Sequence, residues 1–248
     1  MKGAKLAVVL LLLAMIAIAL SCKKNKGVQP ISNLKIAYVD KYHAGSVLHY
    51  RFVYDSYNNV DSTIIVGGGT DTGTTNFMAF MYYGSFFSIT TAYNGAYDVD
   101  VNSNNLISEV PLYDTLLMTY NNNELTEQDI KSPITTPPYY SIAATDYTWA
   151  NGDIASYTNQ GISYTLDYNQ SRPGQLGDGW RIDLFLSYGT SYIQTTHLPT
   201  DIMNGAAWVE KYFYQFDGQG RISQFIRTQN NNGSGADDTT IYNYQYDY

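Results

Sequence analysis

The chain has few of the side chains from which metal and catalytic sites are most often built. Its 248 residues include one cysteine and three histidines, so an internal disulfide is excluded and a zinc site has few ligands to draw on. His43, His49 and His197 show neither HxH nor HxxxH spacing. Charged residues make up only 15% of the chain, and 22 acidic against 14 basic residues disfavour a nucleic acid partner.

Common catalytic motifs are missing as well. Gly67-Gly68-Gly69 lacks the Lys-Ser/Thr of a phosphate-binding loop, and no G-x-S-x-G nucleophile elbow occurs. Asp98, Asp100 and Asn102 have the alternating spacing of a calcium loop, but Ser103 replaces the glycine that an EF-hand needs, so we interpret them as a solvated strand face. We therefore predict no catalysis, no metal and no cofactor.

The N-terminus has the pattern of an export signal. Lys2 and Lys5 precede residues 6–20, which are all apolar. This run has the length of a signal-peptide core and is short for a bilayer-spanning helix, which needs about 20 apolar residues. Small residues then lead to Cys22 in the sequence Ala-Leu-Ser-Cys.

This Ala-Leu-Ser-Cys segment resembles the lipobox of bacterial lipoproteins. The resemblance implies that residues 1–21 are a lipoprotein signal peptide, that Cys22 carries the lipid holding the chain on a membrane, and that residues 22–33 are a tether. An uncleaved N-terminal anchor, or a secretory signal with an incidental cysteine, is the alternative. Because no acidic residues follow Cys22 directly, we expect an outer-membrane lipoprotein of the cell envelope that faces the periplasm.

The remaining chain, residues 34–248, has the composition of a β protein. It is rich in tyrosine (25 in the whole chain), threonine, asparagine and glycine; the first two favour strands and the last two favour tight turns. Long helical periodicity is absent after the signal segment, and only residues 199–209 show some helical character. About a dozen strands in meander order are predicted.

A strand–turn–strand unit is clearest at residues 212–225, where alternating aromatics lead into Asp217-Gly-Gln-Gly220 and alternation then resumes. The aspartate can accept hydrogen bonds from turn amides, and the last glycine can supply a positive φ. Weaker copies are predicted with turns at Asp55–Asn58, at 102–105, at 121–123 and at Asn151-Gly152. Further strands are predicted at 164–168, 180–188 and 241–248, with a loop at 174–179.

Residues 214–222 resemble the YD-type repeat. Together with the lipobox, the pattern is similar to lipoproteins of unknown function from Bacteroides-type bacteria, whose single antiparallel sheet curls in a porin-like way. The resemblance implies an all-β fold, an antiparallel meander forming a curled sheet or barrel after an N-terminal signal helix. It implies no catalytic residues.

We expect a lipid-anchored binding or scaffold protein of the cell envelope. The sequence does not identify its ligand, for which a glycan, a peptide or another envelope protein on a tyrosine-lined concave face are the candidates. Aromatic side chains can stack on sugar rings, and the candidate ligand-binding residues are Trp149, Trp180 and Trp208. The same aromatics could equally form cross-strand pairs within the sheet. Two other functions stay open: a glycan-processing enzyme using a carboxylate pair, and an outer-membrane β-barrel, whose strands would need an apolar outer face.

Overall fold

The structure is a computed structural model that describes residues 35–67, 75–83, 85–91, 95–104, 106–111, 114–131, 141–189, 193–231 and 236–247. All of them belong to one compact unit, Asn33–Tyr248. The predictions for the signal peptide, for Cys22 and for the tether all lie outside the described residues.

The described residues of this unit form sixteen strands and one helix. The first eight strands are β1 (Ile36–His43), β2 (Ser46–Tyr54), β3 (Val60–Gly67), β4 (Thr75–Tyr82), β5 (Phe86–Thr91), β6 (Gly95–Val101), β7 (Ile107–Pro111) and β8 (Thr115–Asn121). The remaining elements are β9 (Glu124–Lys131), β10 (Ser141–Ala150), β11 (Asp153–Asn159), β12 (Ile162–Pro173), α2 (Ile182–Tyr188), β13 (His197–Asn204), β14 (Ala207–Phe216), β15 (Ile222–Gln229) and β16 (Asp238–Tyr246).

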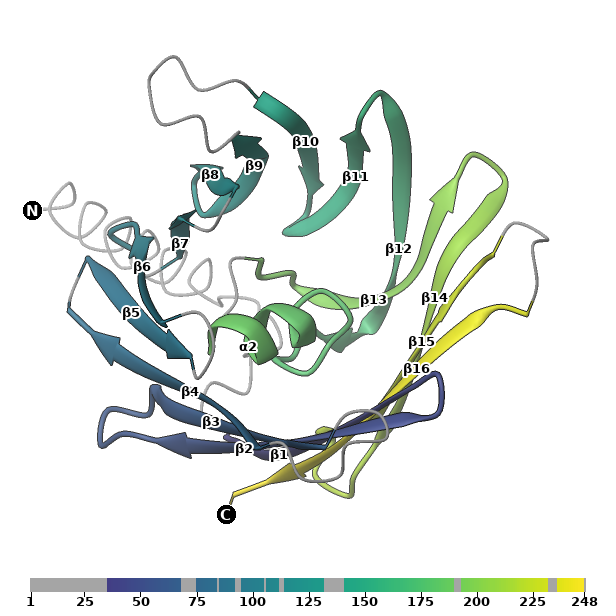
Figure 1. Ribbon diagram of the computed structural model, residues 1–248. Helices are drawn as coiled ribbons and strands as arrows, with labels where there is room; N and C mark the ends of the chain where they lie inside the picture. Colours follow the sequence, from purple (N-terminus) through teal and green to yellow (C-terminus); the bar gives the residue numbers. More distant parts are fainter. Residues whose placement is uncertain are drawn as a thin grey trace, which may run out of the picture. The chain divides into compact units, whose positions relative to one another are not determined.

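The strands form a closed antiparallel barrel in chain order. Each strand pairs with its sequence neighbours, and β16 pairs with β1, where Tyr42 lies opposite Ile241. Figure 1 shows the ring of strands with α2 inside it. The all-β antiparallel meander is thus confirmed, with sixteen strands where about a dozen were expected; β1, β4, β5 and β13 are the additional ones.

Three of the turns share one hydrogen-bond pattern. The side-chain Oδ1 atoms of Asp55, Asn102 and Asp217 each accept hydrogen bonds from the amides two and four residues later, at 2.8–3.1 Å. Three residues after the aspartates, Asn58 and Gly220 have φ of 69° and 80°. The expected role of the aspartates and of the left-handed residue is therefore confirmed at these two turns.

Two segments differ from the sequence-based expectation. Residues 180–188, expected as a strand, contain the helix α2, which buries Ile182, Phe185 and Leu186 on one face and ends at Gly189 with φ of 67°. Residues 199–209, which show some helical character, instead form the β13–β14 hairpin. In both segments the short apolar pattern fits the period of a helix as well as that of a strand, so tertiary packing determines which of the two forms. Among the described residues no helix is long and apolar enough to cross a membrane.

Aromatic side chains tie neighbouring strands together at one end of the barrel. At the ends of five even-numbered strands, a tyrosine or tryptophan donates to the backbone carbonyl of a buried aliphatic residue at the start of the preceding strand, at 2.6–3.0 Å. The pairs are Tyr54–Ile36, Tyr82–Val60, Tyr120–Ile107, Trp149–Leu125 and Tyr246–Ile222. The acceptor side chains are at most 2% exposed. Four tyrosines and one tryptophan therefore serve to close this end of the wall.

Candidate functional site in the barrel interior

The two ends of the barrel differ in their contents. We call the end where β1 begins and β16 finishes the entry end, and the end that carries the β1–β2 turn the far end. The inward-facing residues nearest the entry end are fully buried, as at Ile36, Ile107 and Ile154. Charged inward-facing side chains nearer the far end stay partly exposed, with 23% of Lys41 and 22% of Arg227 accessible.

The segment that fills the entry end lies between β12 and β13; we call its described residues, 174–189 and 193–196, the plug. Its first turn is bound to the wall by side-chain hydrogen bonds. The Tyr244 hydroxyl donates to the carbonyl of Gly177 at 2.8 Å, and the Gly179 amide donates to the Tyr214 hydroxyl at 3.2 Å. The side chain of Gln175 donates to the carbonyl of Gly220 at 3.0 Å and accepts from the amide of Ile222, the first residue of β15, at 3.1 Å. The plug is therefore an integral part of the barrel.

A buried carboxylate organises the turn that leads into α2. Asp178 has a fully buried side chain and accepts hydrogen bonds from the amides of Gln175, Trp180 and Arg181 at 3.1–3.2 Å. Burial raises the pKa of Asp178, against the opposing charge of Arg181 and the three amides. The guanidinium of Arg181 also donates a hydrogen bond to the carbonyl of Thr195 at 2.6 Å, and this bond joins the two ends of the plug.

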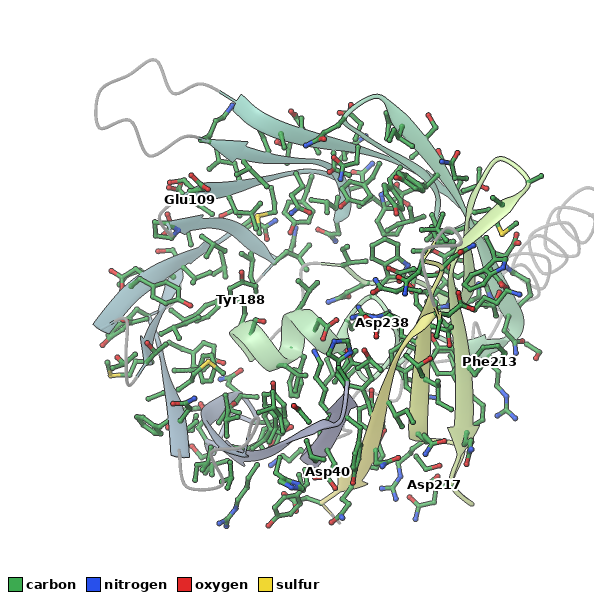
Figure 2. All side chains as sticks on the ribbon, turned by 45° about the vertical axis from the view of Figure 1, so that its right-hand side comes forward. Asp40, Glu109, Tyr188, Phe213, Asp217 and Asp238 are labelled. Atoms are coloured by element: carbon green, nitrogen blue, oxygen red, sulfur yellow. The ribbon has the colours of Figure 1, made fainter. Side chains whose placement is uncertain are left out.

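The helix α2 packs on the part of the wall formed by β2, β3 and β4, largely through aromatic contacts. The rings of Phe185 and Phe52 lie 4.7 Å apart, and Phe185 is only 2% exposed. At the end of the helix, a Cβ atom on Gly189 would lie 3.2–3.4 Å from Val60 and Phe80, so the helix fits closely against β3 and β4. Figure 2 shows Tyr188 on the inner side of the ring. The apolar core thus includes the plug and the surrounding strands.

On the side of α2 that faces the far end, a group of charged side chains converges on Asp183. Its carboxylate accepts from Lys41 Nζ at 2.9 Å, from Arg227 Nη1 at 2.8 Å and from the Tyr242 hydroxyl at 2.9 Å. Burial alone would raise the pKa of Asp183, but the charges of Lys41 and Arg227, with the hydrogen bonds from Lys41 and Tyr242, hold it below its ordinary value. Burial, together with the charge of Asp183, raises the pKa of Tyr50 to about 12.

A second carboxylate, Glu210, completes this group. It accepts from the Tyr212 hydroxyl and from Gln229 Nε2, both at 2.6 Å. Burial alone would lower the pKa of Arg227, but the charges of Tyr242, Asp183 and Glu210 raise it above its ordinary value. We call Lys41, Asp183, Glu210 and Arg227 the far-end cluster. It contains two positive and two negative side chains, so it presents hydrogen-bonding groups without a net charge.

An aromatic row adjoins the far-end cluster. Tyr147, Tyr157 and Tyr164 lie on neighbouring strands with ring centroids 6.0 and 4.7 Å apart, the second pair stacked. Burial, followed by the charge of Glu210, raises the pKa of Tyr157. The Tyr147 hydroxyl donates to Gln128 at 3.1 Å. Half-buried aromatic rings beside fixed polar groups are what a ligand site for a neutral polar molecule requires.

The three tryptophans proposed for ligand binding do not share a surface. The Trp149 indole donates to the carbonyl of Leu125 and forms part of the entry-end closure. Trp180 lies in the plug, with its ring edge-on to Tyr157 at 5.9 Å. Trp208 lies at the start of β14 under the ammonium of Lys211, at 4.9 Å from its ring centroid. Ligand binding by these residues stays a prediction.

Other candidate residues do not gather into a metal site. Asp98 and Asp100 lie in β6, and within the described ranges no group of three or more histidine, cysteine, aspartate or glutamate side chains could hold a metal ion. His197 Nδ1 lies 2.7 Å from Oδ2 of buried Asp153, and the His197 backbone amide donates to Oδ1 of the same carboxylate at 2.8 Å, which fixes the return of the chain to the wall. Sequence reasoning missed the far-end cluster, whose members are far apart in the chain.

The outer surface carries alternating rows of side chains across β14, β15, β16, β1 and β2. One row is polar: Gln215, Gln224, Asn243, Asp40 and His49. Hydrogen bonds of 2.7–2.9 Å join Gln215 to Gln224, Gln224 to Asn243, and His49 to Asp40. The next row is apolar: Phe213, Ile226, Ile241, Tyr42 and Val47. The row beyond it is polar again, with Lys211, Thr228 and Thr239. Figure 2 shows Phe213 on the outer side of the wall.

Comparison with known proteins shows the fold alone. No family model matches the chain, and no curated protein matches its sequence. The solved structures with a similar fold include two porin-like proteins that are each 12% identical to this chain. The one from Bacteroides uniformis ATCC 8492 has a TM-score of 0.61 over 86% of this chain and 96% of that chain. The one from Bacteroides vulgatus ATCC 8482 has a TM-score of 0.55 over 87% of this chain and 99% of that chain. The chain therefore has the fold of Bacteroides porin-like proteins.

Proposed function

We propose that the protein is a lipid-anchored, periplasm-facing binding protein of the cell envelope, which takes up a glycan on the inner face of its far end and catalyses no reaction. The observation that carries the proposal is the filled interior: the plug occupies the entry end and leaves hydrogen-bonding and aromatic groups toward the far end. Lipidation of Cys22 rests on the sequence pattern described above.

The plug favours binding over transport. A water-filled pore needs a continuous polar lumen. Here the entry end is packed with apolar side chains that are almost fully buried, such as Phe185, Phe225 and Ile222, and the plug is hydrogen-bonded to three strands of the wall. Opening a channel would require this core to be dismantled.

The outer rows favour a wall that faces water. A lipid-facing wall needs an apolar band about 25 Å tall. On β14 to β2 the apolar row is one residue tall, and since alternate residues on a strand are about 7 Å apart, polar rows follow closely on both sides. The outer surface of β10 to β12 is also hydrophilic, with hydrogen-bonded pairs Thr148–Ser156 and Thr158–Ser163. An outer-membrane barrel fits the same fold but not these rows.

The carboxylates of the interior disfavour a glycan-processing enzyme. A general acid needs a raised pKa in a place that substrate can reach. The pKa of Asp183 is lowered by its ion pairs, whereas the raised pKa belongs to Asp178, whose fully buried carboxylate is occupied by backbone amides. Neither aspartate combines a raised pKa with a carboxyl group that substrate can reach, as acid catalysis requires.

Glycan binding is tested with the purified mature protein on a panel of bacterial oligosaccharides and peptidoglycan fragments. We expect binding that weakens at least tenfold in Tyr157→Ala and Tyr164→Ala, since both rings adjoin the far-end cluster. Tyr42→Ala, which removes a tyrosine from the outer apolar row, serves as the control and should bind as the wild type does. Equal loss in all three variants, or binding that none of them changes, would contradict this location.

A further inference from the structure

The largest concentration of exposed apolar side chains lies at the entry end, on the sector formed by β2 to β5. Tyr57 is 84% exposed in the β2–β3 turn, and Tyr83 and Met81 are 53% and 50% exposed at the end of β4 and just after it. Val53, near the end of β2, is 37% exposed. We call Val53, Tyr57, Met81 and Tyr83 the entry-end patch.

The patch has local order rather than being a scatter of loose side chains. The rings of Tyr83 and Phe86 stack with centroids 4.9 Å apart, and the Tyr83 hydroxyl donates to the sulfur of Met81 at 3.6 Å. Other turns at the same end are polar: the hairpins around Asn102 and Asp217 present asparagine, glutamine and glycine. Among the described residues, the exposed apolar side chains of this end therefore gather in the β2–β5 sector, and Val66 and Phe77, 41% and 43% exposed, continue them along β3 and β4 toward the far end.

This sector lies beside the point where the chain enters the barrel. Lys35, directly before β1, sits at the entry end, where its carbonyl accepts from the Asp247 amide at 3.1 Å, and its ammonium lies 5.2 Å from the Tyr54 ring centroid. Lys35 follows Cys22 by thirteen positions, so a lipid on that cysteine would be at most about 45 Å of chain away from the patch-bearing end.

We propose that the entry-end patch docks on the surface of the bilayer that holds the lipid, so that the far-end cluster points away from the membrane; this inference rests on the lipid anchor of the proposed function. Tyrosine suits such a surface because its ring enters the interface while its hydroxyl stays hydrated. Asp55 and Asp61 flank the patch and add to the electrostatic field at Tyr82. A zwitterionic bilayer fits this sector better than an anionic one.

The sole cysteine makes a direct test simple. Once the sulfur of Cys22 carries its lipid, an introduced cysteine is the only free thiol, so Ser56→Cys beside the patch and Ala206→Cys in the far-end β13–β14 turn can each carry one bimane fluorophore. The lipidated protein is reconstituted in phosphatidylcholine vesicles with doxyl-labelled lipid, and quenching is measured on the floated fraction. We expect quenching at position 56 to be at least twice that at position 206.

A patch variant completes the design. Tyr57→Asn, Met81→Thr and Tyr83→Asn together, in the Ser56→Cys background, should reduce quenching to the level at position 206, since all three side chains are at least half exposed and contribute little to the core. Floated protein with equal quenching at both positions overturns the docking. Protein that does not float at all overturns the lipid anchor instead, and the docking with it.

Discussion

Removal of one ring from the plug should destabilise the whole barrel. Phe185 is 2% exposed and packs against Phe52 with ring centroids 4.7 Å apart. Phe185→Ala removes a buried aromatic side chain and leaves a cavity, which typically costs about 3–5 kcal/mol. If the plug is part of the core, this cost appears in the free energy of unfolding of the entire domain.

The contact between the two rings can be isolated with a double-mutant cycle. An aromatic pair contributes about 0.5–1.5 kcal/mol beyond its buried area, so Phe52→Ala, Phe185→Ala and the double variant should be non-additive by that amount. Phe213→Ala provides a matched control, because this ring is 55% exposed on the outer wall and its loss should change stability by about 0.5 kcal/mol or less.

The assay is urea unfolding followed by circular dichroism and by tyrosine and tryptophan fluorescence. We expect a single transition for every variant, with a lower midpoint and an unchanged slope for Phe185→Ala. A destabilisation below about 1 kcal/mol would refute the reasoning. So would a separate early transition reported by fluorescence alone, because the plug would then unfold without the wall.

Two further variants test the electrostatics and the turns. The pKa of Asp183 lies below its ordinary value of 3.8, so its ion pairs stabilise the fold above about pH 4 and are lost as the pH falls through the lowered value. The stability difference between wild type and Asp183→Asn, from urea unfolding at several pH values, should shrink in acid; a difference that grows there would contradict the ion pairs. Asp217→Ala should cost about 1 kcal/mol because it removes the acceptor of two turn amides. Asp217→Asn, which keeps Oδ1 as Asn102 does, should restore most of that stability; equal loss in both variants would show that the turn does not depend on this acceptor.

Local chemistry made the hairpins predictable from sequence. An aspartate or asparagine after an alternating aromatic run, followed by Asn58 or Gly220 with positive φ, encodes the turn within a few residues. The aromatic alternation of β16 is equally local, since Tyr242 and Tyr244 are both buried on the inner face. These features depend only on neighbours along the chain.

The features that depend on closure could not be predicted in this way. The plug looks like another strand because its short apolar run fits two periods, and only Phe52, Val60 and Phe80 on distant strands favour the helix. The far-end cluster joins β1, α2, β14 and β15, so no spacing in the sequence indicates it. The calcium-loop spacing of Asp98, Asp100 and Asn102, by contrast, is visible in the sequence because these residues are close together along the chain.

The most direct test of the central claim is the behaviour of the mature chain, residues 22–248, carrying Cys22→Ala and produced without its signal segment. It should be measured by analytical ultracentrifugation and circular dichroism in buffer that contains no detergent. A filled barrel with polar outer rows predicts a soluble, monodisperse β protein that unfolds in one cooperative transition. A chain that aggregates in buffer and recovers its β structure only in detergent or lipid would contradict the claim and identify the wall as a membrane-spanning surface.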